Sequence, residues 1–171
     1  MRIEPQVDEP KVDEWFNYDV FLSFRGEDTC HGFTSHLYRA LRQSGIHAFM
    51  DDSGLERGEE VSASLMQAIE RSQIALLIFS PDYASSRWCL DELVKIMECR
   101  RRLGRVAIPI FYEVDPSEVR SQRGRYGEAI ERHEERLGRE NDGVMWWKVM
   151  EWRSVLKEAA KISGFSSSAY R

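Results

Sequence analysis

The chain has 171 residues, of which 42% are hydrophobic and 31% are charged, and this suits a single domain with a full core. A formal net charge of −5, without a long basic tract, gives no general attraction to phosphate backbones or acidic membranes, so nucleic acid is not expected as a partner. The three cysteines have no paired spacing, which suggests neither a disulfide framework nor a zinc site and fits a reducing cytosol. No apolar run approaches the roughly 20 residues that cross a bilayer.

Residues 1–16 mix Asp, Glu and Pro without periodicity, so we expect a flexible leader there and a single domain over residues 17–171. Four short apolar runs follow the leader: YDVFLSF, HAFMD, IALLIFS and VAIPIFY. Each run is separated from the next by a stretch of helical length. This alternation predicts parallel strands joined by crossover helices.

The first two connections both carry helical patterns. Between the first two runs, apolar residues recur at helical spacing and Gly45 follows as a stop signal. These apolar residues are Phe33, Leu37, Tyr38 and Leu41. A charged loop with Gly54 and Gly58 then precedes a second helix, which is marked by Leu65, Ala68 and Ile69.

The third and fourth runs differ in what they predict. Residues 74–79 contain no polar side chain, so both faces of this strand should be covered, as in the centre of a doubly wound sheet. Pro109 cannot donate a ladder hydrogen bond, which places the fourth strand toward an edge or beside a short neighbour. The helix between them should begin after Ser85 or Ser86 and bury a stripe formed by Leu90, Leu93, Val94 and Met97. Its last turn carries arginines 100–102, which complement the helix dipole and are assigned no function.

Two further helical patterns lie between Arg123 and Ile162 and are interrupted by GRENDG. The apolar face of the later one is formed by Trp152, Leu156, Ala159 and Ala160, and Gly164 should end it. SGFSS could then supply a short fifth strand. The chain ends soon afterwards, so a helix after that strand would be missing or barely begun.

Standard catalytic signatures do not occur in this sequence. It has neither GxxxxGK[ST] nor GxGxxG, which disfavours a P-loop kinase and a simple Rossmann dehydrogenase. The four histidines lack the paired spacing of a metal site, and there is no GxSxG elbow for a serine hydrolase.

The segment SSRWCLDEL places a large aromatic ring beside a carboxylate. At 100° per residue, Trp88 and Glu92 lie one turn apart, on the side of their helix away from the apolar stripe. Helix geometry alone favours a surface tryptophan beside a solvated glutamate. However, ligands of open parallel sheets bind outside the carboxyl ends of the strands, where the first turn of this helix lies. A ring and a carboxylate at that rim could stack on a base or nicotinamide and bond ribose hydroxyls.

Several ordered motifs resemble those of plant Toll/interleukin-1 receptor (TIR) domains, the signalling modules of many intracellular immune receptors. They are YDVFLSFRGEDT, the RG within LERGEE, SSRWCLDEL and PIFYEVDPSEVRSQRG. The resemblance runs from about Tyr18 to Gly164. Each motif alone is weak, but together and in this order they are highly specific.

The resemblance implies an α/β, flavodoxin-like three-layer fold with a five-stranded parallel sheet in the order 2-1-3-4-5. It also implies an NAD+ nucleosidase that oligomerisation activates, with NAD+ as the substrate and no separate cofactor or metal. Glu92 matches the catalytic glutamate, and the other substrate-binding matches are Phe24, Arg25, Gly54, Arg57 and Trp88. Cys30 stands where the family often has an arginine that helps to hold the substrate, so affinity for the substrate is expected to be weaker.

Self-association is the second implication of the resemblance. Ser35 and His36 match a pair at a symmetric helix interface, and Gly164 matches a glycine at a second interface. Spacing alone favours a solvated helix residue at His36, and only the resemblance supports an interface role. The partners implied are other TIR domains and either NAD+ or NADP+, with a cytoplasmic or nuclear location and no membrane. A purely homotypic adaptor without chemistry is the alternative function.

Overall fold

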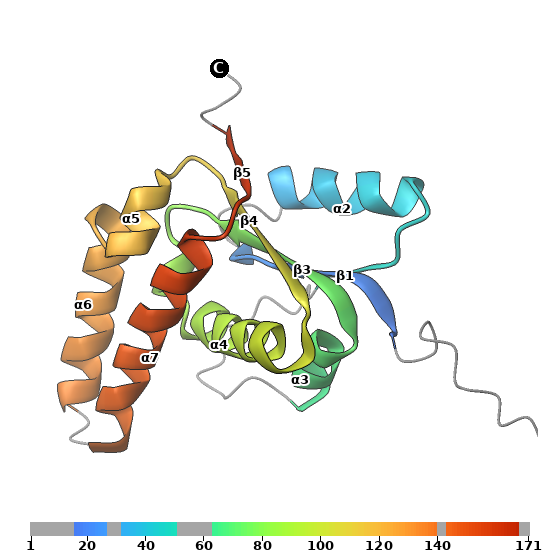
Figure 1. Ribbon diagram of the computed structural model, residues 1–171. Coiled ribbons are helices and arrows are strands. Elements are labelled where there is room, and N and C mark those ends of the chain that lie inside the picture. Colours follow the sequence, from blue (N-terminus) through green and yellow to red (C-terminus); the bar gives the residue numbers. More distant parts are fainter. Residues whose placement is uncertain (1–15, 27–31, 51–62, 140–142, 168–171) are drawn as a thin grey trace, which may run out of the picture.

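The computed structural model describes residues 16–26, 32–50, 63–139 and 143–167. Its centre is a parallel sheet, as the alternating pattern predicted, in the order β2-β1-β3-β4-β5 that the family resemblance implied. The strands are β1 (Tyr18–Ser23), β2 (Ala48–Met50), β3 (Ser72–Phe79), β4 (Val106–Phe111) and β5 (Phe165–Ser166). The apolar strand β3 occupies the middle of the sheet, where helices cover both of its faces (Figure 1).

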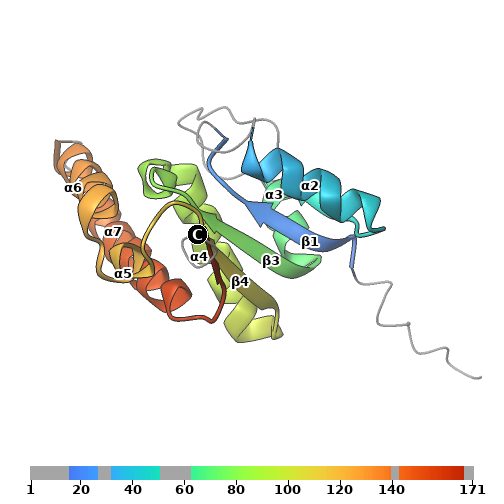
Figure 2. The ribbon, with the colours of Figure 1, turned by 90° about the horizontal axis from the view of Figure 1, so that it is seen from above.

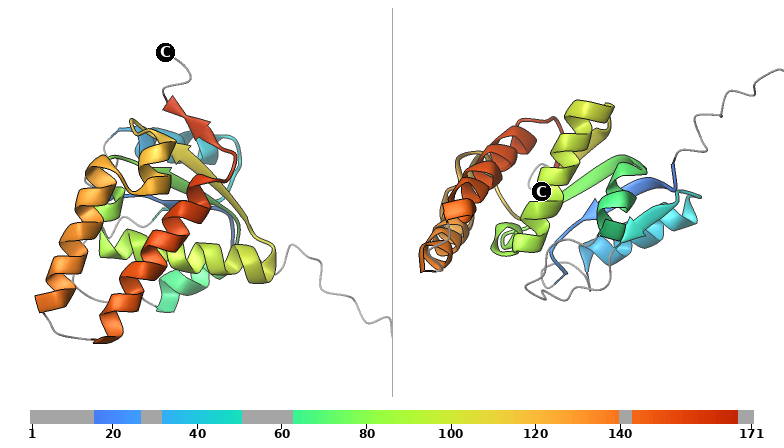
Figure 3. Two further views of the ribbon diagram at one scale, coloured as in Figure 1. Left: turned by 60° about the vertical axis from the view of Figure 1, so that its left-hand side comes forward. Right: turned by 90° about the horizontal axis from the view of Figure 1, so that it is seen from below.

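Helices flank the sheet on both sides and complete the three layers. They are α2 (Phe33–Gln43), α3 (Ala63–Glu70), α4 (Arg87–Leu103), α5 (Pro116–Ser121), α6 (Gly124–Arg139) and α7 (Gly143–Ala160). Helix α2 covers one face, and α3 and α4 cover the other (Figure 1). Helices α6 and α7 lie side by side on the flank of α4 (Figures 2 and 3). None of the helices in the described ranges is both long enough and apolar enough to span a bilayer.

The core is divided between the two faces of the sheet. The larger cluster contains Phe21 and Leu77 from the sheet. Of the predicted stripe of α4, Leu90, Leu93 and Met97 are buried, whereas Val94 is only half-buried against this cluster. The smaller cluster, which includes Val20 and Leu22, packs against α2. The predicted apolar face of α7 is buried as well, with Trp152 and Leu156 inaccessible to solvent.

The short edge strand β5 explains why β4 can contain Pro109 and why residue 164 is a glycine. Strand β5 pairs with only two residues of β4, Ile110 and Phe111, so Pro109 faces no ladder partner on that side. The prediction of a short neighbour is therefore confirmed. A Cβ atom on Gly164 would overlap the carbonyl oxygen of Pro109, so the chain approaches β4 too closely for any other residue.

Helix α4 begins and ends as predicted. The Ser86 hydroxyl accepts a hydrogen bond from the Cys89 amide at 3.2 Å, which caps the first turn. Gly104 ends the helix with a φ of 66°. The arginines of its last turn form ion pairs, since Arg101 contacts Glu158 and Arg102 contacts Glu98, each at 2.9 Å.

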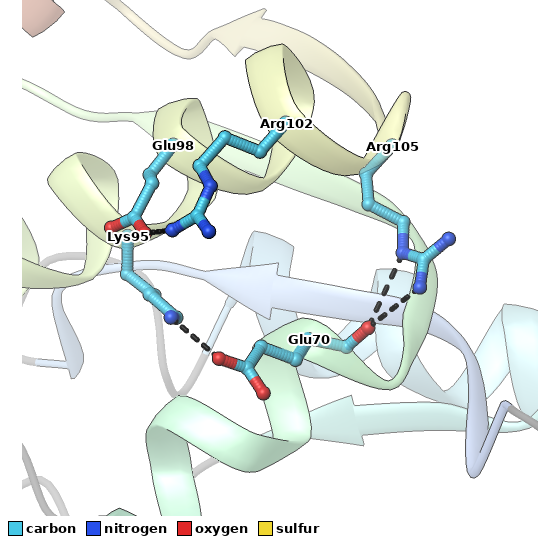
Figure 4. Close-up of polar contacts among 5 residues, drawn as sticks. All are labelled: Glu70, Lys95, Glu98, Arg102 and Arg105. Atoms are coloured by element: carbon cyan, nitrogen blue, oxygen red, sulfur yellow. Dashed lines mark hydrogen bonds and ion pairs between the residues drawn. The ribbon is translucent and has the colours of Figure 1, made fainter.

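Polar contacts tie the C-terminus of α3 to α4 and to the start of β4 (Figure 4). Lys95 of α4 donates to the Glu70 carboxylate at 2.6 Å. The Arg105 guanidinium donates twice to the Glu70 carbonyl oxygen, at 3.1 and 3.2 Å. These contacts lock α3 against α4 and against the start of β4.

Two short elements were not predicted from the sequence. One is the 3-10 turn η2 (Tyr83–Ser85), between β3 and α4. The other is α5, which Asp115 caps by accepting from the Ser117 amide at 2.8 Å and which has Pro116 in its first turn. Both elements are too short to show a helical period in the sequence.

Candidate functional site

Three elements meet at the carboxyl end of β1. Ser23 is the last residue of this strand, and its side chain is fully buried. The turn η2 brings Tyr83 to the same place, and the first turns of α4 bring Trp88 and Glu92. This is the edge at which open parallel sheets bind their ligands.

The Glu92 carboxylate is held at both oxygens. Ser23 donates its hydroxyl to Oε1 at 2.9 Å, and the indole N–H of Trp88 donates to Oε2, also at 2.9 Å. Glu92 is only 4% exposed. Two donors from two different elements therefore fix the plane of a buried carboxylate.

Tyr83 extends this arrangement. Its hydroxyl lies 2.8 Å from the Ser23 hydroxyl and 3.2 Å from the Cys89 carbonyl oxygen. Burial raises the pKa of Tyr83 well above its usual range, and the neighbouring Cys89 and Glu92 add to the effect. Tyr83 therefore remains a neutral phenol that can donate a hydrogen bond.

The expected placement of Trp88 and Glu92 was only partly right. Their contact across one helical turn is confirmed by the hydrogen bond between them. They do not lie off the core, however, because Glu92 is buried and the half-buried Trp88 packs against the larger core cluster. The end of β1 and the turn η2 cover the side of α4 that a helical projection leaves open.

Phe24 and Arg25 directly follow β1, at the same edge as Glu92. The Phe24 carbonyl accepts a hydrogen bond from the Cys89 thiol at 3.4 Å, and the Phe24 ring packs toward α2. Arg25 donates to the Asp82 carbonyl at 3.0 Å, next to Tyr83. Asp82 in turn pairs with Arg125 at 3.0 Å.

The remaining predicted residues lie elsewhere. His36 is exposed and Ser35 half-buried on α2, and Gly164 is exposed just before β5. Gly54, Arg57 and Cys30 lie outside the described residues, so their predicted roles stay predictions. Within the described ranges no group of three His, Cys, Asp or Glu side chains could hold a metal ion.

Ser23 and Tyr83 were missed by sequence reasoning. The signal for Ser23 was available, because it is a polar residue within the apolar run YDVFLSF. A polar side chain on a buried strand needs a hydrogen-bond partner. Tyr83 gave no such signal, since it lies in a polar connection whose path depends on tertiary packing.

A groove of about 220 Å³ lies away from Glu92, between α4 and α7. Its walls carry both signs of charge, including Lys95, Lys148 and Glu151, above an apolar floor at Val94. Its lysines are already paired, Lys148 with Asp91 at 3.5 Å and Lys95 with Glu70. We therefore assign no ligand to this groove.

Comparisons with known proteins show the family of the chain. The profile of the TIR domain family matches residues 17–171. The chain is 51% identical over 158 residues to Disease resistance protein RPV1 of Vitis rotundifolia, which covers 91% of this chain and 10% of that protein. It is 51% identical over 149 residues to TMV resistance protein N of Nicotiana glutinosa, covering 87% and 13% of the two chains. The TIR domains in the structure of the activated Roq1 resistosome, which directly recognises the effector XopQ, superpose with a TM-score of 0.75 at 46% identity over 87% of each chain.

Proposed function

Since this chain belongs to the TIR domain family, we propose that it releases nicotinamide from NAD+ and that Glu92 is its catalytic carboxylate. The chain spans only 10 to 13% of the length of the two resistance proteins described above. We propose that this domain supplies the signalling activity of a comparable disease-resistance protein, in which its product would trigger defence. The single observation that supports the chemistry is the burial of Glu92, fixed at both oxygens, at the ligand-binding edge of the sheet.

The reaction breaks the bond between ribose C1′ and the nicotinamide nitrogen. The electron pair of that bond leaves with nicotinamide, which is already cationic in NAD+ and departs neutral, so no general acid is needed. Positive charge then develops on the ribose, and a buried carboxylate stabilises it more strongly than water would. Water attacks C1′ and forms the new C–O bond. Its proton passes to Glu92, and the products are ADP-ribose and nicotinamide.

Trp88 serves this site in two ways. Its indole N–H orients Oε2 of the carboxylate, and its ring is half-buried at the rim, where it can stack on the planar nicotinamide. Phe24 and Arg25 lie at the same edge and are proposed to contact the substrate. Attack by the adenine in place of water would give a cyclic product from the same intermediate.

The experiment is to incubate concentrated protein with NAD+, and separately with NADP+, and to follow nicotinamide by chromatography. Glu92→Gln keeps the shape of the side chain but removes its charge, and should slow release by on the order of 100-fold or more. Glu70→Gln is the matched control, because Glu70 is paired with Lys95 outside the site, and it should retain full activity. Equal rates for Glu92→Gln and the wild type would exclude the catalytic role of Glu92.

A second candidate function is homotypic association. It is favoured by the structural similarity to TIR domains seen in an activated resistosome. We propose that copies of this chain pair through α2, where His36 is exposed. For Gly164, the close approach to Pro109 already explains the glycine, so an interface role rests on the resemblance alone.

Sedimentation at increasing concentration tests the α2 interface. His36→Ala should weaken self-association, whereas His47→Ala, at an exposed histidine just before β2, should not. An unchanged association constant for His36→Ala would show that α2 is not used.

A further inference from the structure

Three buried side chains form a continuous chain of hydrogen bonds that ends on Glu92. Tyr83 and Ser23 are each 0% exposed and Glu92 is 4% exposed. The Tyr83 and Ser23 hydroxyls are 2.8 Å apart, and the Ser23 hydroxyl is 2.9 Å from Glu92 Oε1. The three groups come from η2, β1 and α4, so the chain forms only in the folded domain.

The direction of these bonds follows from the number of protons that each group carries. An ionised carboxylate can only accept, so Ser23 must donate its one hydroxyl proton to Glu92. The Ser23 oxygen then accepts from Tyr83, which is kept neutral by its burial. In the ionised state the chain runs from Tyr83 through Ser23 to Glu92.

The same heavy atoms also suit the protonated acid. If Glu92 carries a proton, it can donate to Ser23, Ser23 can donate to Tyr83, and Tyr83 can donate to the Cys89 carbonyl at 3.2 Å. Only hydroxyl protons rotate between the two states. Since an unsatisfied buried polar group is costly, a chain that satisfies both states avoids that cost when Glu92 takes up a proton.

We infer that Ser23 and Tyr83 are positioning residues for Glu92. Their two hydroxyls orient the Glu92 carboxylate and supply its hydrogen-bond partner both before and after it takes up a proton. The inference rests on the proposed function for its catalytic meaning. In that reaction Glu92 is an anion while the bond to nicotinamide breaks and an acid after water attacks. The chain serves both stages without moving an atom heavier than hydrogen.

The sequence offers matched controls for both residues. Ser23→Ala removes the donor to Glu92. Ser72→Ala removes an equally buried serine hydroxyl, which donates to the Ala68 carbonyl at 2.7 Å and lies at the other end of the sheet.

The tyrosine pair is matched in the same way. Tyr83→Phe removes the next hydroxyl of the chain. Tyr126→Phe removes the hydroxyl of another fully buried tyrosine, which donates to the Ser80 carbonyl at 2.7 Å.

The primary measurement is a ¹³C NMR titration of the Glu92 carboxyl carbon, whose signal is identified by its absence in Glu92→Gln. Ser23→Ala should move the titration midpoint to higher pH by roughly one unit, because the anion loses a donor that it needs more than the neutral acid does. Tyr83→Phe should move it in the same direction by less. Ser72→Ala and Tyr126→Phe should leave it unchanged.

Activity gives an independent second readout. Ser23→Ala should lower kcat for nicotinamide release about tenfold with KM within about twofold, and should move the acid limb of the pH profile upward, in step with the titration. If the wild type releases no nicotinamide, the proposed function fails, while the titration still decides the positioning role. If the midpoint is the same in Ser23→Ala, Ser72→Ala and the wild type, the positioning role is wrong even if the enzyme is active.

Folding of the variants is checked by thermal unfolding before titration. If Ser23→Ala does not fold, Ser23→Cys takes its place, because a thiol is close in size and a weaker donor. The midpoint should then rise by less than is expected for alanine, and no rise at all would overturn the inference.

Discussion

Glu92 and Glu70, two of the glutamates at helix α4, are stabilised in opposite ways. Glu92 belongs to the helix, is buried, and accepts from a hydroxyl and an indole N–H. Glu70 comes from the end of α3, its side chain is 47% exposed, and it accepts from the Lys95 ammonium at 2.6 Å. Neutral donors orient a carboxylate without cancelling its charge, whereas an ammonium ion does both.

This difference is the one expected between a structural carboxylate and the catalytic carboxylate that we propose for Glu92. The hydrogen bond from Lys95 is the main reason that the pKa of Glu70 lies below its usual value. That pair joins two helices and leaves little net charge to act on anything else. At Glu92, the donors that the structure describes are a hydroxyl and an indole N–H, and these fix the orientation of the carboxylate.

The largest expected effect comes from giving Glu92 the kind of partner that Glu70 has. Trp88→Arg places a guanidinium one turn from Glu92, where it can pair with the carboxylate and neutralise it. Nicotinamide release should fall by on the order of 100-fold relative to the wild type, measured with NAD+ at fixed protein concentration.

Trp88→Leu is the control, because it removes the ring and the indole donor without adding charge. It should lose about tenfold, so the added cation accounts for the remaining loss. If the arginine and leucine variants are equally active, neutralisation of Glu92 does not limit the reaction, and the comparison with Glu70 has no catalytic meaning.

A smaller effect should distinguish the turn that carries Tyr83 from the Glu70–Lys95 pair, because the two contribute to stability in different ranges of pH. The Nε2–H of His133 donates to the Ala84 carbonyl oxygen at 2.8 Å, and this bond supports the turn that carries Tyr83. Burial lowers the pKa of His133 below its usual 6.5, and Arg136, Arg87 and Arg132 act in the same direction. Below about pH 6.5 the unfolded chain therefore binds a proton that the folded chain resists, and stability should fall with a slope of up to about 1.4 kcal/mol per pH unit.

Glu70 should affect the stability of the fold at a lower pH than His133 does. Its folded pKa is depressed, so the stability that it contributes is present above the ordinary value of 4.5 and is lost as the pH falls through the folded value. Urea unfolding followed from pH 8 to well below pH 4.5 separates the two windows. His133→Gln keeps a hydrogen-bonding amide near Ala84 and should abolish only the upper decline; if that decline persists, another group causes it.

The smallest effect is expected from Lys95→Met, which removes the cation from Glu70. The pair is partly exposed, so its loss should lower the free energy of unfolding by only about 0.5 kcal/mol, and by less at high ionic strength. Nicotinamide release should be unchanged. A loss of activity in this variant would mean that the ion pair supports the site as well as the helix contact.

Much of the scaffold follows from local sequence signals. The alternation of apolar runs with helical stretches predicted the parallel sheet, and Pro109 predicted the short neighbour that β5 provides. Ser86 caps the start of α4, and Gly104 takes the left-handed conformation at its end. Residues next to the helix therefore determine where it begins and ends. The turn η2 and helix α5 were missed because each is shorter than two helical turns.

The candidate site was only half predictable, for a physical reason. The contact between Trp88 and Glu92 is set by helical geometry and was expected. The burial of Glu92 depends on the end of β1 and on a turn between β3 and α4, which spacing within one helix cannot reveal. Ser23 and Tyr83 are 60 residues apart in the sequence, and only the parallel register of the sheet brings them together.

Helix α4 is continuous from Arg87 to Leu103, which makes it a rod about 25 Å long. The first turns of this rod carry the Glu92 carboxylate. Farther along, Lys95 binds Glu70 of α3 and Arg101 binds Glu158 of α7. A stiff rod cannot tilt at one end without tilting at the other. Because separate contacts to α3 and α7 hold the same rod, the loss of one of them, as in Lys95→Met, leaves the orientation of Glu92 unchanged.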